Sequence, residues 1–419
     1  MIVRRIPWRG DAAAAFARIS AGSSAAVWLD SARAAYGMGR FSILGAGDPI
    51  RTGWDDLADR IEREAAPPVP GIPFAGGYAV VADYEGAVEA IRLDRFLVVD
   101  HAAGELAAVG PGAAEAAELL RDTQDAPPLP DPGEEPPSGP ARASVTRARY
   151  LDDLAAVRGW LEAGDSYEAC VTYRLRFPFA GDGFAAYRRL RRDNPAPYAA
   201  YVRLPGREIL SCSPERFLAV SPDGRAETKP IKGTARRLAD PGADAAAASA
   251  MARDPKTRAE NLMIADLLRN DLGRISEPGS VEVPVLMGVE TYATVHQLVT
   301  TVRSRLRPRP VRGVRAAQAL FPPGSMTGAP KVRTVALLAG LEADPRGAYA
   351  GALGYVSRDG AVDLSVVIRT AEIAGGEARV GTGGAVTIDS DPAAELDETI
   401  AKSTPVLRAF GRTHPLAAG

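Results

Sequence analysis

The sequence predicts an α+β protein built on antiparallel sheets. Short β-rich runs follow one another without an intervening helix, as in residues 348–357, 362–373 and 378–388, and this order is typical of antiparallel strands. No short-period repeat occurs, which excludes a solenoid. With 419 residues and 46% apolar side chains, the chain can bury a large core, in two or three ordinary domains or in one two-lobed unit.

The predicted elements lie on either side of a seam, residues 125–144, which is dense in proline and acidic residues. Such a segment sustains neither a helix nor a strand ladder, so we expect a linker or a surface loop. The part before the seam, 1–124, has β-rich runs at 24–31, 76–84 and 95–100 and an alanine-rich helix at 110–124. The part after it, 145–419, opens with a helix, a Gly-Asp turn and a strand, and contains further strands and helices.

Composition excludes several classes of protein. Fifty basic and 52 acidic side chains give a formal charge of −2, so no global field favours a nucleic acid or an anionic membrane. The two cysteines, Cys170 and Cys212, are far apart and lack metal-ligand spacing, which argues against a disulfide framework and a zinc site. No signal-like start and no long apolar run occur, so we expect a cytoplasmic protein.

Two predicted helices begin in the same way, with an aspartate cap followed by proline. The first starts at Asp254 and carries Glu260 next to its apolar face, where an unpaired carboxylate would be costly. The second starts at Asp391, and Glu395, Glu398 and Lys402 share one face of it. These residues could form an ordinary exposed ion pair, or the carboxylates of both helices could hold one hard divalent cation such as Mg²⁺.

Other polar residues admit two interpretations. The stretch "GSMTGAPK" lacks the spacing of a phosphate loop, whereas the glycines of "VGTGGAVT" could form either an anion-binding nest or a tight turn. His296 could be a buried structural histidine. Arg369 ends a strongly β-forming run, where an arginine is unusual unless it reaches an anion or an acidic partner. Lys232, in "KPIKGT", could be a surface cation or a nucleophile.

Taken in order, a series of motifs makes the sequence resemble the chorismate-utilising enzymes over roughly residues 145–410, and most closely their aminodeoxychorismate synthase branch. The motifs are "SPERF", "KPIKGT", "RAENLMIADLLRNDLGR", "VHQLVTTV", "GSMTGAPK", "GALGYV", "DLSVVIRT" and "GTGGAVTIDSDPAAELDET". The resemblance implies the anthranilate-synthase-like fold, a two-lobed sandwich of large antiparallel β-sheets surrounded by helices. It makes 145–419 the chorismate-binding catalytic domain and 1–124 the N-terminal subdomain of the sandwich.

The resemblance also implies the reaction, because members that make anthranilate have alanine where this chain has Lys232. Lys232 would add at C2 of chorismate as the C4 hydroxyl leaves; ammonia would then add at C4 and expel the lysine, giving 4-amino-4-deoxychorismate. Glu215 would be the general acid and base of both steps. A nucleophilic lysine must be neutral, which requires a desolvated pocket or a nearby cation. The product is the precursor of 4-aminobenzoate, for folate or for a secondary metabolite.

The remaining site residues are also implied by the resemblance. Mg²⁺ would be held by Glu260 and Glu398, with Glu395 nearby, and it would bind the ring carboxylate. His296 is a further catalytic candidate and, with Ser325, matches positions that line the ring pocket. The residues expected to bind the substrate's carboxylates are Tyr349, Arg369, Gly383, Gly384 and Lys402. The "WLDS" element, which contains Asp30 and Ser31, resembles one that lies near a tryptophan-binding pocket in related enzymes.

Three positions depart from the family pattern. Glu168 stands where isochorismate- and salicylate-forming relatives have a water-activating lysine and where many aminodeoxychorismate synthases have glutamine. Thr257 replaces a frequent acid three residues before Glu260, and Ala385 replaces a glycine. The lysine-dependent hydration reactions are therefore disfavoured.

Other functions remain as alternatives. An anthranilate synthase component I or a 2-amino-2-deoxyisochorismate synthase is disfavoured by Lys232, which would occupy the C2 face where their ammonia adds. A silent regulatory subunit that binds chorismate or tryptophan is disfavoured by the intact set of acids. Neither cysteine lies in a nucleophile-elbow setting, so we expect ammonia from solution or from a separate glutamine amidotransferase subunit.

Overall fold

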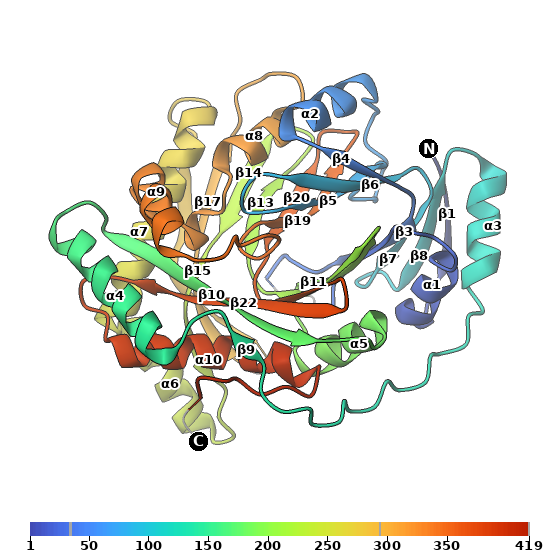
Figure 1. Ribbon diagram of the computed structural model, residues 1–419. Helices are drawn as coiled ribbons and strands as arrows, with labels where there is room; N and C mark the ends of the chain where they lie inside the picture. Colours follow the sequence, from blue (N-terminus) through green and yellow to red (C-terminus); the bar gives the residue numbers. More distant parts are fainter. Residues whose placement is uncertain (33–35, 293–294, 418–419) are drawn as a thin grey trace.

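The computed structural model describes residues 1–32, 36–292 and 295–417 and shows two large antiparallel sheets with helices packed around them (Figure 1). In the described residues the first sheet has 12 strands. Its order is β1 (Ile2–Pro7), β8 (Glu105–Gly110), β7 (Phe96–Asp100), β3 (Phe41–Ala46), β2 (Ala26–Asp30), β11 (Tyr198–Leu204), β12 (Arg207–Ser213), β21 (Thr370–Ala374), β22 (Glu377–Val386), β10 (Glu168–Pro178) and β18 (Gly328–Ala329), with β9 (Arg142–Ala143) paired to β10.

The second sheet has 10 strands in the same described ranges. Its order is β15 (Ile231–Arg236), β17 (Val295–Arg305), β14 (Arg225–Lys229), β13 (Arg216–Val220), β20 (Val362–Val366), β19 (Ala352–Ser357), β5 (Gly77–Ala82), β6 (Val88–Leu93) and β4 (Asp48–Thr52), with β16 (Glu282–Thr291) paired to β17. All of the pairings between these strands are antiparallel. The predicted α+β class and the sandwich of antiparallel sheets are confirmed.

The helices cover the outer faces of both sheets (Figure 1). Those packed on the first sheet are α1 (Ala12–Ile19), α3 (Ala113–Thr123), α4 (Arg147–Glu162), α5 (Gly183–Asp193) and α10 (Pro392–Arg408). Those that contribute to the core of the second are α2 (Trp54–Arg63), α7 (Pro255–Ile275) and α8 (Arg312–Leu320). The remaining helices are α6 (Pro241–Arg253), α9 (Lys331–Leu341) and the 3₁₀ turn η1 (Gly324–Met326). No described helix is long and apolar enough to cross a membrane.

Strand β10 shows how the sheets position polar groups. Because side chains alternate along a strand, Val171, Tyr173 and Leu175 pack into the apolar core between the first sheet and its helices. The intervening side chains, such as Glu168 and Cys170, face the second sheet; Cys170 belongs to the core of that sheet. The inner face of β10 can therefore bring polar side chains into a buried space between the two layers.

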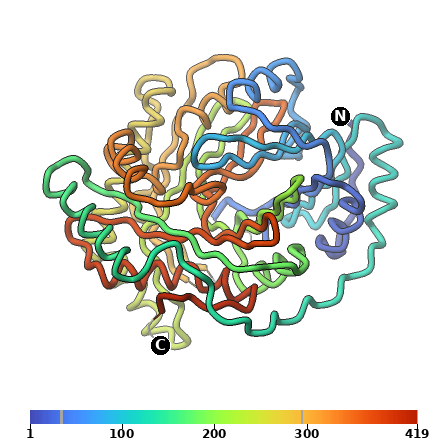
Figure 2. The backbone as a smooth tube through the Cα atoms, viewed as in Figure 1, coloured from blue at the N-terminus to red at the C-terminus, as the bar shows by residue number. Residues whose placement is uncertain are grey.

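The predicted seam runs as an extended segment over the outside of the protein (Figure 2). Residues 126–139 form neither helix nor strand, and Glu135 pairs with Arg189 of α5 at 2.6 Å. Strands from before and after the seam are paired in both sheets, as β2 is with β11 and β5 with β19. The proposed boundaries at 124 and 145 stay predictions, and the two parts share both sheets.

Trp28 provides a test of the packing of the first sheet. It is fully buried, and its ring lies 5.7–6.3 Å from the rings of Phe16, Phe184 and Tyr187. We expect Trp28→Ala to lower the free energy of unfolding by about 3–5 kcal/mol, because it removes a large buried ring and leaves a cavity. Urea denaturation measures this. Val332→Ala, on an exposed position of α9, should change stability by less than about 0.5 kcal/mol; equal effects of the two changes would contradict the packing described.

Candidate active site

Lys232 lies in the buried space between the sheets and forms an ion pair with Glu168. Its Nζ donates to Glu168 Oε1 at 2.5 Å, and both residues are at least nine-tenths buried. Burial acts to lower the pKa of Lys232, but the Glu168 and Glu260 carboxylates outweigh it, so that the pKa lies above its ordinary value. The resting lysine is therefore protonated, and the surface-cation interpretation is wrong.

An irregularity in the sheet accompanies this placement of Lys232. The register between β15 and β17 shifts between Ile231 and Thr234, as at a β-bulge. Gly233 has a φ of +96°, and a Cβ at this position would lie 2.4 Å from Cγ2 of Thr257 on α7. Glycine therefore allows both the backbone conformation and the close approach of α7, the helix that carries Glu260.

Glu215 lies in the link between β12 and β13, and it is buried. Burial raises the pKa of Glu215 to about 7, against the opposing effects of a hydrogen bond from Ser325 and of the nearby charges of Lys232, Lys402 and Arg369. A carboxyl group with a pKa near neutrality can donate and accept a proton at physiological pH. The structure thus places Glu215 and Ser325 together and near Lys232.

The three carboxylates predicted to hold Mg²⁺ come from α7 and α10. Burial raises the pKa of Glu260 to about 7, although Lys232 and Lys256 oppose the shift. Lys256 forms a short hydrogen bond with Glu395 and lies 3.6 Å from Glu260. Glu398 is half-exposed and pairs with Lys402 at 2.7 Å. The ammonium of Lys256 therefore lies between carboxylates of two different helices.

The carboxylates of α7 and α10 bear on the predicted Mg²⁺ site. Among the residues that the structure describes, no three His, Cys, Asp or Glu side chains are grouped as a metal site as they stand. Glu395 is nonetheless buried, with no hydrogen-bond partner for its Oε2. A Cβ on Gly384 would lie only 3.0 Å from that atom, so the glycine allows the carboxylate to approach the strand closely. Carboxylate oxygens with a spare acceptor are ligands that a hard cation prefers.

The predicted carboxylate-binding residues lie along β22 and at its neighbours. Arg369 has a φ of +50° between β20 and β21, and within the described ranges its guanidinium has no ion pair or hydrogen bond. Burial lowers the pKa of Arg369. Lys402 donates to the carbonyl of Gly383 at 3.3 Å. A partly buried, unpaired guanidinium is typical of an anion site.

Tyr349 lies against Gly381, where a Cβ would clash with its ring at 2.1 Å.

His296 is held by two neighbours instead of being free: its Nε2 lies 3.0 Å from Asp244 and its Nδ1 2.9 Å from the Thr291 hydroxyl. Both ring nitrogens are thus occupied. The catalytic role of His296 stays a prediction.

Two residues of this site were not among the predicted catalytic and ligand residues. Glu168 was noted only as a departure from the family pattern, although its carboxylate accepts a hydrogen bond from Lys232. Lys256 was missed; its spacing of four residues from Glu260 was the available signal.

Thr257 is turned to the helix cap, because its hydroxyl donates to Asp254 at 2.6 Å. Lys331 of "GSMTGAPK" pairs with Asp271 at 2.6 Å, which explains it without a phosphate.

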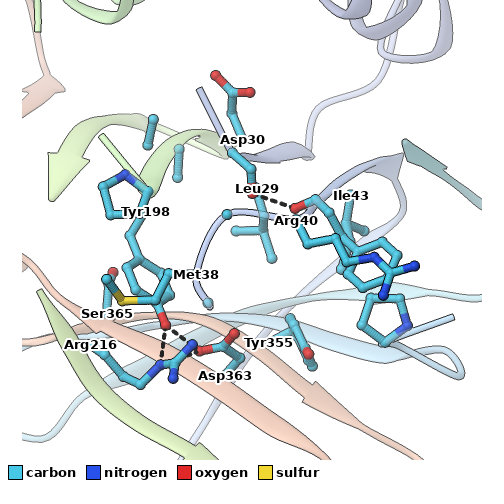
Figure 3. A pocket seen from close by; sticks show the side chains of 18 of the residues that line it. Leu29, Asp30, Met38, Arg40, Ile43, Tyr198, Arg216, Tyr355, Asp363 and Ser365 are labelled. Carbon is cyan, nitrogen blue, oxygen red and sulfur yellow. Dashed lines mark hydrogen bonds and ion pairs between the residues drawn. The ribbon is translucent and has the colours of Figure 1, made fainter. Parts of the chain in front are cut away.

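A separate cavity of about 220 Å³ lies between the sheets next to Asp30 and Ser31 (Figure 3). In its wall, Arg216 donates to the Tyr198 hydroxyl at 2.5 Å, and this hydroxyl donates to Asp363 at 2.8 Å. The carboxylate of Asp30 is bound by Arg191 and Tyr187. None of the residues predicted to act on the substrate lines this cavity.

Comparison with known proteins identifies the class. Residues 74–408 match the family model described as chorismate binding enzyme, and the chain belongs to this family. Anthranilate synthase component I from Streptococcus pneumoniae TIGR4 has a similar structure, with a TM-score of 0.76 and 27% identity over 88% of this chain and 92% of that one.

Within the family, relatives named for one activity are similar over nearly the whole chain. Aminodeoxychorismate synthase of Streptomyces pristinaespiralis is 42% identical over 98% of this chain and 65% of its own length. Aminodeoxychorismate synthase component 1 of Klebsiella aerogenes is 35% identical over 96% of this chain and 97% of its own length. The chain thus spans about two thirds of the Streptomyces relative.

The raised pKa of Glu215 predicts a pH-dependent stability. The folded state holds the proton up to a pKa of about 7, whereas the unfolded carboxyl ionises from its ordinary 4.5, so the wild type loses stability as the pH rises through this window. The Glu215→Gln variant lacks this carboxyl group and therefore does not lose this stability as the pH rises. We expect the unfolding free energy of the variant relative to the wild type to increase by roughly 2 kcal/mol between pH 5 and pH 8.

Urea denaturation at the two pH values measures this difference. Glu62→Gln, on an exposed position of α2, serves as the control and should show no such change with pH. A difference for Glu215→Gln that stays constant from pH 5 to pH 8 would contradict a carboxyl group that titrates near neutrality.

Proposed function

We propose that this protein replaces the C4 hydroxyl of chorismate by ammonia and yields 4-amino-4-deoxychorismate and water. The observation that carries the proposal is the buried Lys232 between the two sheets, in contact with Glu168 and near Glu215. The names of the relatives that share nearly the whole chain support the same reaction. A buried lysine is suited to covalent catalysis. Burial disfavours the charged ammonium, and the neutral amine is the form that attacks a substrate.

The first step forms a bond between Lys232 Nζ and C2 of the ring. Both ring double bonds shift, and the C4 hydroxyl leaves as water after it takes a proton from Glu215. Ammonia then adds at C4, both double bonds shift back and the bond to Lys232 breaks. Glu215 recovers a proton from the incoming amine, so the acid is regenerated in each cycle.

Lys232 must lose a proton before it attacks, and Glu168 is the acceptor placed to receive it. The two groups are 2.5 Å apart and shielded from water. Transfer of the proton converts an ion pair into a neutral pair, which burial favours. Glu168 thus has a role in this chain that a glutamine at the same position could not fill.

The two carboxylates of chorismate would be bound by Arg369 and Lys402 and by the amides of Gly383 and Gly384. The unpaired guanidinium of Arg369 and the absence of side chains on the two glycines support this arrangement. Tyr349 would line the same site. These groups orient the ring so that C2 faces Lys232 and C4 faces Glu215.

Glu260, Glu395 and Glu398 would hold Mg²⁺, and the spare Oε2 of Glu395 supports this assignment. When bound, the metal would supply positive charge opposite a ring carboxylate. Lys256 lies between Glu260 and Glu395, so its ammonium would have to leave this position for these two carboxylates to hold the cation. We further propose that ammonia comes from a glutamine amidotransferase subunit, as the designation component 1 of the Klebsiella relative suggests.

Product analysis tests the reaction. The purified chain is incubated with chorismate, Mg²⁺ and ammonium at mildly alkaline pH, together with a lyase that converts aminodeoxychorismate to 4-aminobenzoate. We expect 4-aminobenzoate from the wild type, a fall of at least about a hundredfold for Lys232→Ala, and loss of product without Mg²⁺.

Lys232→Arg is the matched variant, because it keeps the positive charge but lacks a nucleophilic amine. It should be as inactive as Lys232→Ala. Activity near that of the wild type in Lys232→Arg would reduce the lysine to an electrostatic role. Anthranilate as the wild-type product would refute the proposed reaction and favour the anthranilate synthase alternative.

Glu168→Gln tests whether the Glu168 charge controls the protonation of Lys232. Removing the carboxylate charge lowers the pKa of Lys232, so the neutral amine is present at lower pH. We expect the acid limb of the kcat/KM profile to move down by at least about one pH unit. Tyr167→Phe, an exposed neighbour, should leave the profile in place. An unchanged profile in Glu168→Gln would mean that Glu168 does not control the protonation of Lys232.

A further inference from the structure

Lys256 lies in the first turn of α7, and its ammonium contacts carboxylates of two helices. Its Nζ donates a short hydrogen bond to Glu395 Oε1 on α10 and lies 3.6 Å from Glu260 Oε1. The pair with Glu260 alone would be an ordinary contact between residues four apart on one helix. The contact with Glu395 is different, because it joins segments 139 residues apart and involves a buried acid.

The charge of Glu395 is balanced by this ammonium. The side chain of Glu395 is 1% exposed, and in the described ranges Lys256 is its only ion-pair partner. The same is true of Glu260, whose side chain is 13% exposed. An unpaired carboxylate in such a place is costly. Lys256 therefore stabilises both acids in the metal-free protein.

The other two lysines near these acids have carboxylate partners of their own. Lys232 forms an ion pair with Glu168, and Lys402 forms one with Glu398. Without the ammonium of α7, the two acids beside it would have no ion-pair partner in the part of the chain that the structure describes. Two carboxylates match the charge of one divalent cation, whereas an ammonium supplies a single positive charge.

We propose that Lys256 competes with the divalent cation for Glu260 and Glu395, so that it sets the affinity of the Mg²⁺ site and neutralises the two acids until the metal binds. The competition follows from position, since the ammonium lies between the carboxylates that the cation would share. Two positive charges at this place would repel each other strongly. The inference rests on the Mg²⁺ site of the proposed function.

The exposure of the three side chains is consistent with displacement of the lysine. The side chain of Lys256 is 29% exposed and that of Glu395 is 1% exposed, so the lysine is the member of the group that reaches solvent. Its four-carbon side chain is flexible, and its ammonium is strongly hydrated in water. Displacement thus exchanges a buried ion pair for a hydrated ammonium and a metal bound by carboxylates.

Calorimetric titration of the full chain with MgCl₂, in the absence of chorismate, tests the inference. Lys256→Met keeps a side chain of similar length and removes its charge, so we expect this variant to bind Mg²⁺ at least about tenfold more tightly than the wild type. Lys256→Arg keeps the charge and should bind no more tightly than the wild type. Arg258→Met removes a positive charge from an exposed position of α7 and should leave the affinity unchanged.

The stability of the metal-free protein gives a second measurement. Urea denaturation in the presence of a chelator should show that Lys256→Met is less stable than the wild type, and saturating Mg²⁺ should stabilise the variant more than the wild type. A purely structural ion pair would lower the stability without raising the affinity for the metal. If Lys256→Met does not fold without metal, Lys256→Gln, which keeps a hydrogen-bond donor for Glu395, replaces it in both measurements.

Equal or weaker Mg²⁺ binding by Lys256→Met would overturn the inference, and so would the absence of Mg²⁺ binding by both proteins. The titration contains no chorismate, so it is separate from the test of the reaction. Product from the wild type together with an unchanged Mg²⁺ affinity of the variant would refute the inference alone. Tighter binding by the variant without any product from the wild type would refute the proposed reaction alone.

Discussion

Burying the ammonium of Lys232 between two β-sheets is possible because carboxylates accompany it. An unpaired charge in such a place would be expelled or neutralised, whereas here Glu168 accepts a hydrogen bond from it and Glu260 adds a second negative charge nearby. The same burial raises the pKa values of Glu215 and Glu260 to about 7. One desolvated space thus sets the protonation of Lys232, Glu215 and Glu260, the residues proposed as nucleophile, as acid and base, and as a metal ligand.

The sandwich creates that space through the two-faced character of its strands. Alternate residues of β10 fill the core beneath α10 and α4, and the others project toward the second sheet. Helices α7 and α10 begin with the same Asp-Pro arrangement, in which the aspartate caps the first turn. They enter the site from different parts of the chain and place Glu260 and Glu395 on either side of Lys256.

Unsatisfied polar groups mark where ligands are expected. In the part of the chain that the structure describes, the half-buried guanidinium of Arg369 forms no ion pair or hydrogen bond, and Oε2 of Glu395 and two N–H groups of Arg174 are buried without a hydrogen-bond partner. The first two belong to the proposed chorismate and Mg²⁺ sites. The third lies in the packed interior beside the ring of Tyr349. In a low-dielectric interior each such group is costly until a ligand binds, which makes it informative about function.

The sequence by itself determined the antiparallel α+β class, the caps of both acidic helices and the family, because strand periodicity, capping and ordered motifs are local properties of the chain. It also singled out Lys232, Glu215 and Arg369. Only the tertiary structure decided that Glu168 is the partner of Lys232, that Lys256 lies between Glu260 and Glu395, and that His296 is engaged by Asp244 and Thr291. Those facts depend on contacts between segments as many as 139 residues apart, and the energy of a charge depends on its surroundings in space and not on its neighbours in sequence.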